Sequence, residues 1–237
     1  MPRESFQIEL NELYDDVITL GREVESSLDD MVAAMETQDA ERAAKVLGLD
    51  ARFKARGTEL DEACLLLQAR QAPVANDLRF VYTMHAVTNH VVRVGTLCEH
   101  ICRAIADTAD HDRDEELVVA LLEMSRSARS LFHQGMEIFR ARDIDRARDL
   151  QAADDKVDLL YSEAMNLVVN PAVSEVGSPE WRMRAALIVH YLERISDHGA
   201  DIGGRTVFLV TGERMESAMR QYLDRDLHED TDDGEDD

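Results

Sequence analysis

Apolar residues recur every three or four positions along most of this chain. The first such stripe extends over residues 6–35, and this spacing is typical of one buried face of an α-helix. A second stripe starts after Asp39, a suitable N-cap, and continues without interruption to Leu67. A third starts at Pro73, a residue that helices accept in their first turn. The pattern therefore predicts three long helices within residues 5–106.

The second half of the chain shows the same pattern. Residues 107–114 have no apolar period and are predicted to be a linker, after which three more apolar stripes occupy residues 115–212. Ser178 and the following Pro179 suit the N-cap and first turn of the last helix. Because no segment alternates with a period of two for the length of a strand, we expect an all-α protein.

The two halves also align with each other. Residues 39–43 resemble residues 143–147 at an offset of 104, and residues 92–96 match residues 193–197 at an offset of 101. An internal duplication of a three-helix unit explains both matches. The predicted organisation is a first three-helix bundle (5–106), the linker (107–114), a second three-helix bundle (115–212) and a C-terminal extension (213–237) that ends in a disordered acidic tail.

The charge of the chain excludes several classes of partner. It has 26 Lys and Arg against 49 Asp and Glu, which gives a net charge of -23. Binding to nucleic acid and attraction to anionic lipid both depend on Lys and Arg, so neither is expected as a primary role. Lysine accounts for few of the basic residues. An acidic surface in which Arg replaces Lys suggests a protein from a salt-rich cytosol, where ions screen the repulsion.

The expected location is the cytoplasm. The N-terminus lacks the apolar segment of a signal peptide, and the longest uncharged run, residues 80–92, is too short to cross a membrane. We therefore expect no direct membrane insertion. Cys64, Cys98 and Cys102 have no spacing typical of a disulfide framework or a zinc site, and are predicted to be small buried apolar side chains.

Carboxylates at helical spacing are the strongest candidates for chemistry. Side chains four residues apart project from one face of a helix, where like charges repel unless a cation bridges them. Oxygen ligands of this kind suit Mg²⁺, Mn²⁺, Fe²⁺ or Ca²⁺. The alternative is a set of solvated acidic faces on a very acidic protein. The candidates are Glu193, Asp197 and Asp201 in the sixth predicted helix, Asp154 and Asp158 in the fifth, and Asp77 after Pro73.

The sequence contains no arrangement typical of an enzyme. It has no glycine-rich phosphate-binding loop and no nucleophile with a base and an orienting group at recognisable spacing. The histidines are scattered, and side-chain packing is the expected role of most of them. Gly95, Gly199 and Gly203 are expected to allow neighbouring helices to approach closely. We therefore expect a non-enzymatic protein.

Two stretches resemble motifs of the PhoU family of phosphate-transport regulators. They are residues 67–79, LQARQAPVANDLR, and residues 192–202, LERISDHGADI. The resemblance, which covers about residues 5–212, implies two tandem three-helix bundles with metal clusters on carboxylate motifs. It also implies a cytosolic homodimer that regulates the phosphate-specific ABC transporter negatively. The partners it implies are the transporter's ATPase subunit and a phosphate sensor kinase.

The first repeat departs from the family pattern. Val92 and Thr96 stand where a Glu-x-x-x-Asp pair is expected, and Lys54 occupies the position equivalent to Asp158. We therefore expect an Fe, Mn or Mg cluster at the second-repeat carboxylates only. Two alternative functions remain open, a stand-alone metal-binding helical bundle and an accessory protein of a different transporter.

Overall fold

The computed structural model describes residues 3–37, 39–170 and 177–213, and all regular structure in these ranges is helical. The all-α prediction is therefore confirmed. The predicted acidic tail falls within residues 214–237, outside the described ranges. The helices are α1 (Arg3–Thr37), α2 (Ala40–Val46), α3 (Leu49–Gln71), α4 (Ala75–Asp107), α5 (Glu115–Ala141), α6 (Ile144–Val169) and α7 (Pro179–Thr211).

Side chains at the helix starts explain several of these boundaries. The Asp39 carboxylate accepts hydrogen bonds from the backbone N–H groups of the first turn of α2, and Asp143 accepts one in the first turn of α6. Ser178 caps α7 in the same way, and Pro179 follows it at the first helical position. Helix α7 ends at Gly212, whose φ of 83° is in the left-handed region that glycine adopts without strain.

Two details differ from the sequence-based expectation. The second predicted helix is divided into α2 and α3, because the chain turns at Leu47 and Gly48 has a φ of 92°. The aligned segment of the second repeat lies inside the continuous helix α6. Pro73 precedes α4 instead of occupying its first turn, because Ala72 adopts a left-handed conformation that ends α3 and Val74 is the N-cap of α4.

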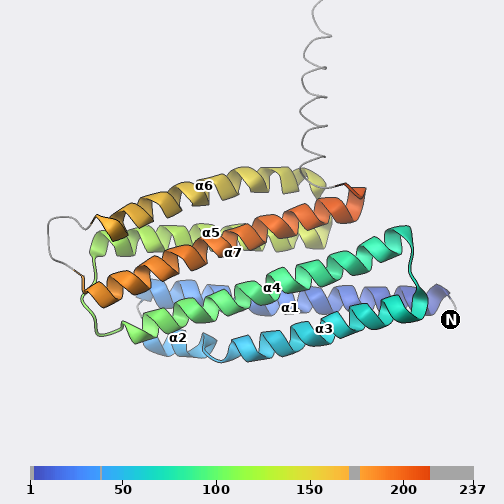
Figure 1. The fold of residues 1–237 in the computed structure, drawn as a ribbon, viewed down its shortest axis with the longest axis horizontal. Helices are drawn as coiled ribbons and strands as arrows, with labels where there is room; N and C mark the ends of the chain where they lie inside the picture. The colour runs from blue at the N-terminus through green and yellow to red at the C-terminus, as the bar shows by residue number, and fades with distance from the viewer. Residues whose placement is uncertain (1–2, 38, 171–176, 214–237) are drawn as a thin grey trace, which may run out of the picture.

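The helices form two bundles that meet through their central members and also through α1 and α5 (Figure 1). In the first bundle α4 packs against α1, α2 and α3, and in the second α7 packs against α5 and α6. Helices α4 and α7 pack against each other in antiparallel orientation. Tyr82 near the start of α4 contacts Phe208 near the end of α7, and Asp107 at the end of α4 pairs with Arg184 near the start of α7 at 3.1 Å. Helices α3 and α6 lie at opposite outer edges.

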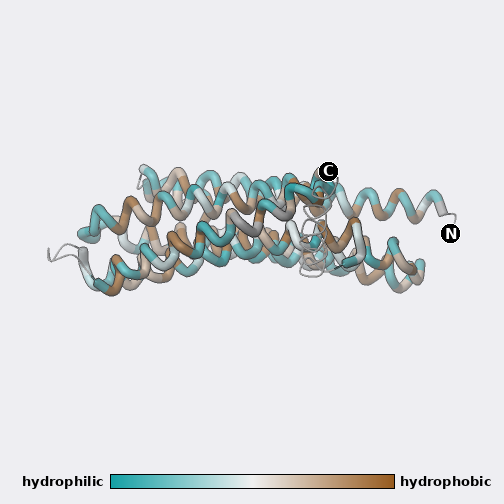
Figure 2. Tube along the Cα trace, turned by 90° about the horizontal axis from the view of Figure 1, so that it is seen from above, coloured by the Kyte–Doolittle hydropathy of each residue, from teal (hydrophilic) through white to brown (hydrophobic). Residues whose placement is uncertain are grey.

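The buried residues follow the helical stripes seen in the sequence. Hydrophilic and hydrophobic residues are interspersed along the helices of the elongated molecule (Figure 2). The core includes large side chains such as Phe53, Phe132 and Phe139, which are almost fully buried. All three cysteines are buried and free, which confirms their predicted role. None of the helices in the described ranges combines the length and apolarity needed to cross a bilayer.

Two glycines allow α5 and α7 to approach very closely. A Cβ atom added to Gly135 would collide with the carbonyl group of Gly199, and one added to Gly199 would lie 2.8 Å from the Cα of Phe132. These neighbours are backbone atoms, so they cannot move aside by a change of rotamer. The expectation that Gly199 permits a close helix contact is confirmed.

We predict that Gly135→Ala destabilises the protein, because the new methyl group can fit only if α5 and α7 separate. Overpacking of this kind costs about 1–3 kcal/mol, measurable as a lower free energy of unfolding in urea. Gly203→Ala is the matched control, because its added Cβ would meet the end of the flexible Leu150 side chain. Equal losses of unfolding free energy in the two variants would show that the close backbone contact does not determine the cost of the added methyl group.

Candidate functional site

Four of the predicted site residues come together in the second repeat, where α6 and α7 lie side by side. Asp154 and Asp158 are one turn apart on α6, and Glu193 and Asp197 are one turn apart on α7. Because residues four apart share a helix face, each pair presents two carboxylates together. We call these four residues the carboxylate cluster.

Nearby positive charge compensates the carboxylate cluster only in part. Burial raises the pKa of Asp154 to about 6, together with the negative charges of Asp197 and Asp158. Burial and neighbouring carboxylates also raise the pKa of Glu193 and that of Asp197, and the nearby Arg194 offsets these effects only in part. The carboxylates of the cluster therefore lie close enough for their negative charges to repel one another.

Two oxygen atoms of the carboxylate cluster are buried without a hydrogen-bond partner in the part of the chain that is described. They are Asp154 Oδ1 and Glu193 Oε2. His190 Nδ1 lies 3.6 Å from Glu193 Oε2, too far for a hydrogen bond. A buried carboxylate oxygen needs a donor or a cation to offset its desolvation. The donor set therefore fits a cation that prefers oxygen ligands, such as Mg²⁺, Mn²⁺ or Fe²⁺.

The two remaining candidates lie elsewhere. Asp201 is one turn beyond Asp197, and its Oδ2 atom lies 3.6 Å from His90 Nδ1 on α4. Its charge still contributes to the raised pKa of Asp154 and of Asp197. Asp77 is in the first turn of α4. This turn lies beside the end of α7, about 20 Å from Asp197 at 1.5 Å per helical residue, so the structure does not bring Asp77 to the carboxylate cluster.

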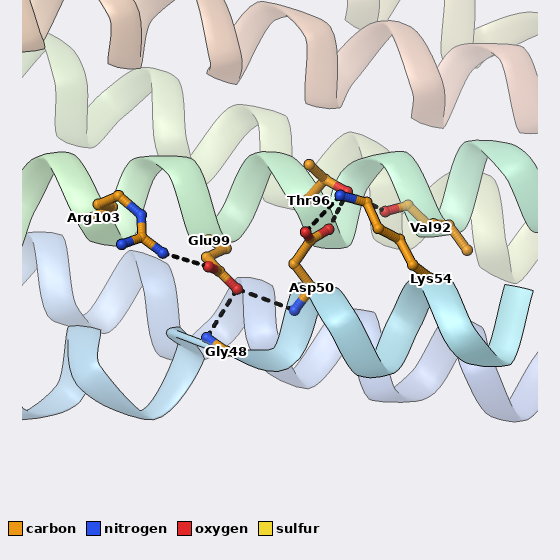
Figure 3. A network of polar contacts seen from close by, with 7 residues as sticks. All are labelled: Gly48, Asp50, Lys54, Val92, Thr96, Glu99 and Arg103. Atoms are coloured by element: carbon orange, nitrogen blue, oxygen red, sulfur yellow. Dashed lines mark hydrogen bonds and ion pairs between the residues drawn. The ribbon is translucent and has the colours of Figure 1, made fainter.

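The equivalent place in the first repeat holds an internally neutralised network (Figure 3). The Asp50 carboxylate accepts a hydrogen bond of 2.6 Å from Lys54 Nζ and another of 2.6 Å from Thr96 Oγ1. Burial raises the pKa of Asp50, but these two hydrogen bonds and the charges of Lys54 and His100 together outweigh it, so the pKa is lowered. The apolar Val92 stands where the second repeat has Glu193. These residues do not fit a cation, because the Lys54 ammonium group already neutralises the carboxylate.

Glu99 extends this network and explains the break between α2 and α3. Its Oε2 atom accepts hydrogen bonds from the backbone N–H groups of Gly48, at 2.9 Å, and Asp50, at 3.1 Å. Its Oε1 atom accepts one of 2.6 Å from Arg103. A side chain of α4 thus supplies the N-terminal cap that Gly48 cannot provide. The second repeat has Ala200 at the aligned position and a continuous helix.

A histidine pair joins the two repeats and was not foreseen from the sequence. His90 on α4 and His198 on α7 face each other, with their Nδ1 atoms 3.1 Å apart. Burial lowers the pKa of His90, and burial with neighbouring positive charge lowers that of His198 to about 4. Both rings are therefore neutral at pH 7. The two residues are 108 positions apart, so only the antiparallel pairing of α4 with α7 reveals the contact.

Comparison with known proteins establishes the family of this chain. The sequence matches the PhoU domain twice, over residues 17–105 and residues 121–206. The chain belongs to the PhoU family. The two matches correspond to the two helical bundles, so the predicted duplication and the resemblance to PhoU are confirmed.

Relatives align with the PhoU-like chain over almost its whole length. The phosphate-specific transport system accessory protein PhoU of Serratia marcescens is 27% identical over 88% of this chain and 85% of its own. The protein of the same name from Escherichia coli is 26% identical over 93% of this chain and 91% of its own. Both are accessory proteins, and the expectation of a non-enzymatic protein is confirmed on this ground.

Solved PhoU structures share the fold. The phosphate transport system regulatory protein PhoU from Streptococcus pneumoniae superposes with a TM-score of 0.80 at 24% identity, covering 89% of this chain and 99% of that one. PhoU from Pseudomonas aeruginosa also has a TM-score of 0.80, at 23% identity, covering 88% of this chain and all of its own. The predicted arrangement of two tandem bundles is therefore that of the PhoU fold.

We predict that Asp154→Asn stabilises the metal-free protein at neutral pH. The pKa of Asp154 is higher in the folded state than in the unfolded state, so the stability linked to this group is present in acid and is lost as the pH rises through about 6. After allowance for solvent screening, we expect a gain of about 1 kcal/mol at pH 7.5. Thermal unfolding in a chelating buffer would measure it.

The gain should shrink as the pH falls from 6 towards 4, because protonation then relieves the same repulsion in the wild type. Asp149→Asn, at an exposed position on α6, is the control and should change little. A lower melting temperature for Asp154→Asn at pH 7.5, or a gain independent of pH, would contradict the repulsion.

Proposed function

We propose that this protein is a negative regulator of phosphate uptake that acts on a phosphate-specific ABC transporter from the cytoplasm. The observation that carries the proposal is the match to PhoU in both repeats, together with relatives along nearly the full length that are accessory proteins of phosphate-specific transport. The partner we infer is the transporter's ATPase subunit. A phosphate sensor kinase is the second partner, through which the protein would restrain the starvation response.

The proposed mechanism is non-catalytic. A rigid helical bundle that binds one conformation of the transporter better than another shifts the equilibrium towards the first, by an amount set by the difference in affinity. The strongly acidic surface supports a partner with basic docking residues, because complementary charge favours correct encounter. We further propose that the working form is a homodimer.

We also propose that the carboxylate cluster binds an Fe, Mn or Mg ion or cluster. The ligands would be Asp154, Asp158, Glu193 and Asp197, and Asp201 lies one turn beyond them on α7. The raised pKa values and the two orphaned oxygen atoms support this assignment. A bound cation would remove the repulsion between α6 and α7, and would thereby alter the acidic face that a partner meets.

One observation favours a second candidate function. The first repeat has Lys54, Val92 and Thr96 in place of a second set of carboxylates. A PhoU-family protein altered in this way could serve as the accessory protein of a different transporter. The same partner experiment distinguishes the two functions.

The regulator proposal predicts recovery of the phosphate transporter's ATPase subunit with the tagged full-length protein. The tagged protein would be recovered from the membranes and cytosol of its own cells, grown with abundant or limiting phosphate, and its partners identified by mass spectrometry. Recovery that changes with phosphate supports the regulator. Recovery of another transporter's subunit would favour the second candidate, and recovery of neither would favour a stand-alone metal-binding bundle.

The metal proposal predicts that Glu193→Ala/Asp197→Ala loses most of the Mn or Fe bound by the wild type, because two of the four ligands are gone. Elemental analysis after dialysis against each metal measures this directly. Asp149→Ala/Glu163→Ala is the matched control, since it removes two exposed carboxylates from α6 outside the cluster. Equal metal content in all three proteins would remove the carboxylate cluster as a metal site.

A further inference from the structure

Three side chains with metal-binding atoms meet where α4 crosses α7. They are His90 from the first repeat, and His198 and Asp201 from the second. One ligand atom from each residue lies within 4.8 Å of the other two. Within this group, His90 Nδ1 is 3.1 Å from His198 Nδ1 and 3.6 Å from Asp201 Oδ2. We call these three residues the inter-repeat triad.

These distances correspond to the edges of a metal coordination shell. Zinc binds histidine nitrogen and carboxylate oxygen at about 2.0–2.2 Å, so neighbouring ligand atoms of a tetrahedral site are about 3.3–3.5 Å apart. The two measured separations, 3.1 and 3.6 Å, lie on either side of this range. His198 and Asp201 are three positions apart on α7, so both project from the same face towards α4. An ion could be held with only small changes of rotamer.

Hydrogen bonding alone leaves the histidine pair incompletely satisfied. Two neutral rings that face each other through Nδ1 can share one proton, with one nitrogen as donor and the other as acceptor. His198 Nε2 is buried and has no hydrogen-bond partner among the described residues. The His90 side chain is only 15% exposed, whereas that of Asp201 is 58% exposed and open to solvent. An ion could therefore enter from the Asp201 side.

We propose that the inter-repeat triad binds a single divalent transition-metal ion of the class that favours imidazole ligands, such as Zn²⁺ or Co²⁺. Two imidazoles and one carboxylate suit such ions better than Mg²⁺ or Ca²⁺, which prefer oxygen ligands alone. Three protein ligands leave a further position for water. The triad therefore differs in its choice of metal from the carboxylate cluster, although Asp201 follows Asp197 by one turn.

An ion bound by the inter-repeat triad would stabilise the contact between the two repeats. One ligand belongs to α4 and two belong to α7, so the ion would link the two repeats directly. Binding to the folded state alone stabilises that state by mass action. Zn²⁺ should therefore raise the melting temperature of the whole chain by several degrees, an effect that depends on His90 and His198 together.

The test is a Co²⁺ titration of the full-length protein after removal of metals by a chelator, followed by the visible absorption of the bound ion and by calorimetry. To separate the two sites, the titration is made in the Glu193→Ala/Asp197→Ala background as well as in the wild type. We expect one bound Co²⁺ per chain to persist in that background. His198→Gln or His90→Gln should weaken its binding by at least about tenfold, because loss of a hydrogen-bond partner of a ligand alone already costs about 10–100-fold.

His100→Gln is the matched control, because His100 lies on α4, as His90 does, and contacts Tyr191 of α7 without belonging to the triad. It should bind Co²⁺ as the wild type does. Asp201→Asn keeps the shape of the side chain and tests the carboxylate. Melting temperatures in chelator show whether each variant is folded, and a folded His198→Gln that binds Co²⁺ as tightly as the wild type would overturn the proposal. Loss of all Co²⁺ binding in the Glu193→Ala/Asp197→Ala background would also overturn it.

Discussion

The antiparallel packing of α4 against α7 is the interaction on which the rest of this structure depends. Each of these helices is central to its own bundle and is also in contact with the other bundle. Both helices therefore bury apolar side chains along their length, including Val87, Val94 and Ile101 on α4 and Val189, Ile195 and Ile202 on α7. Glu193 and Asp197 of α7 lie beside α6, and His90 and His198 lie at the border between the repeats.

The two repeats place different charges at equivalent positions between their helices. In the second repeat, paired carboxylates from α6 and α7 repel one another and leave two buried oxygen atoms without partners among the described residues. In the first repeat, Lys54 neutralises Asp50, and Glu99 uses its charge to cap α3. The backbone arrangement is shared, whereas the charge that it carries is not. The described part of the first repeat therefore lacks the uncompensated carboxylates on which the proposed cation site of the second repeat rests.

The apolar periodicity and the helix caps predicted most of the fold. The features that they did not predict depend on contacts between residues far apart in the sequence. The apolar period and caps such as Asp39 and Ser178 act within a few residues, so the helices and several of their starts were predicted. The break at Gly48 depends on Glu99, which is 51 positions away, and the histidine pair spans 108 positions. Spacing on one helix also found Glu193 and Asp197, but it could not show that Asp77 lies at the far end of α7.

Because the first repeat has a neutralised network where the second has the carboxylate cluster, the first repeat can serve as an internal control for experiments on the second. Both repeats belong to one molecule in one solvent, and the first has Asp50, Lys54, Val92 and Thr96 at the positions of the carboxylate cluster. A spectroscopic or exchange signal that changes equally in α3 and α6 reports on the common scaffold. A signal that changes in α6 but not in α3 reports on the carboxylate cluster, because the first repeat serves as the control within the same molecule.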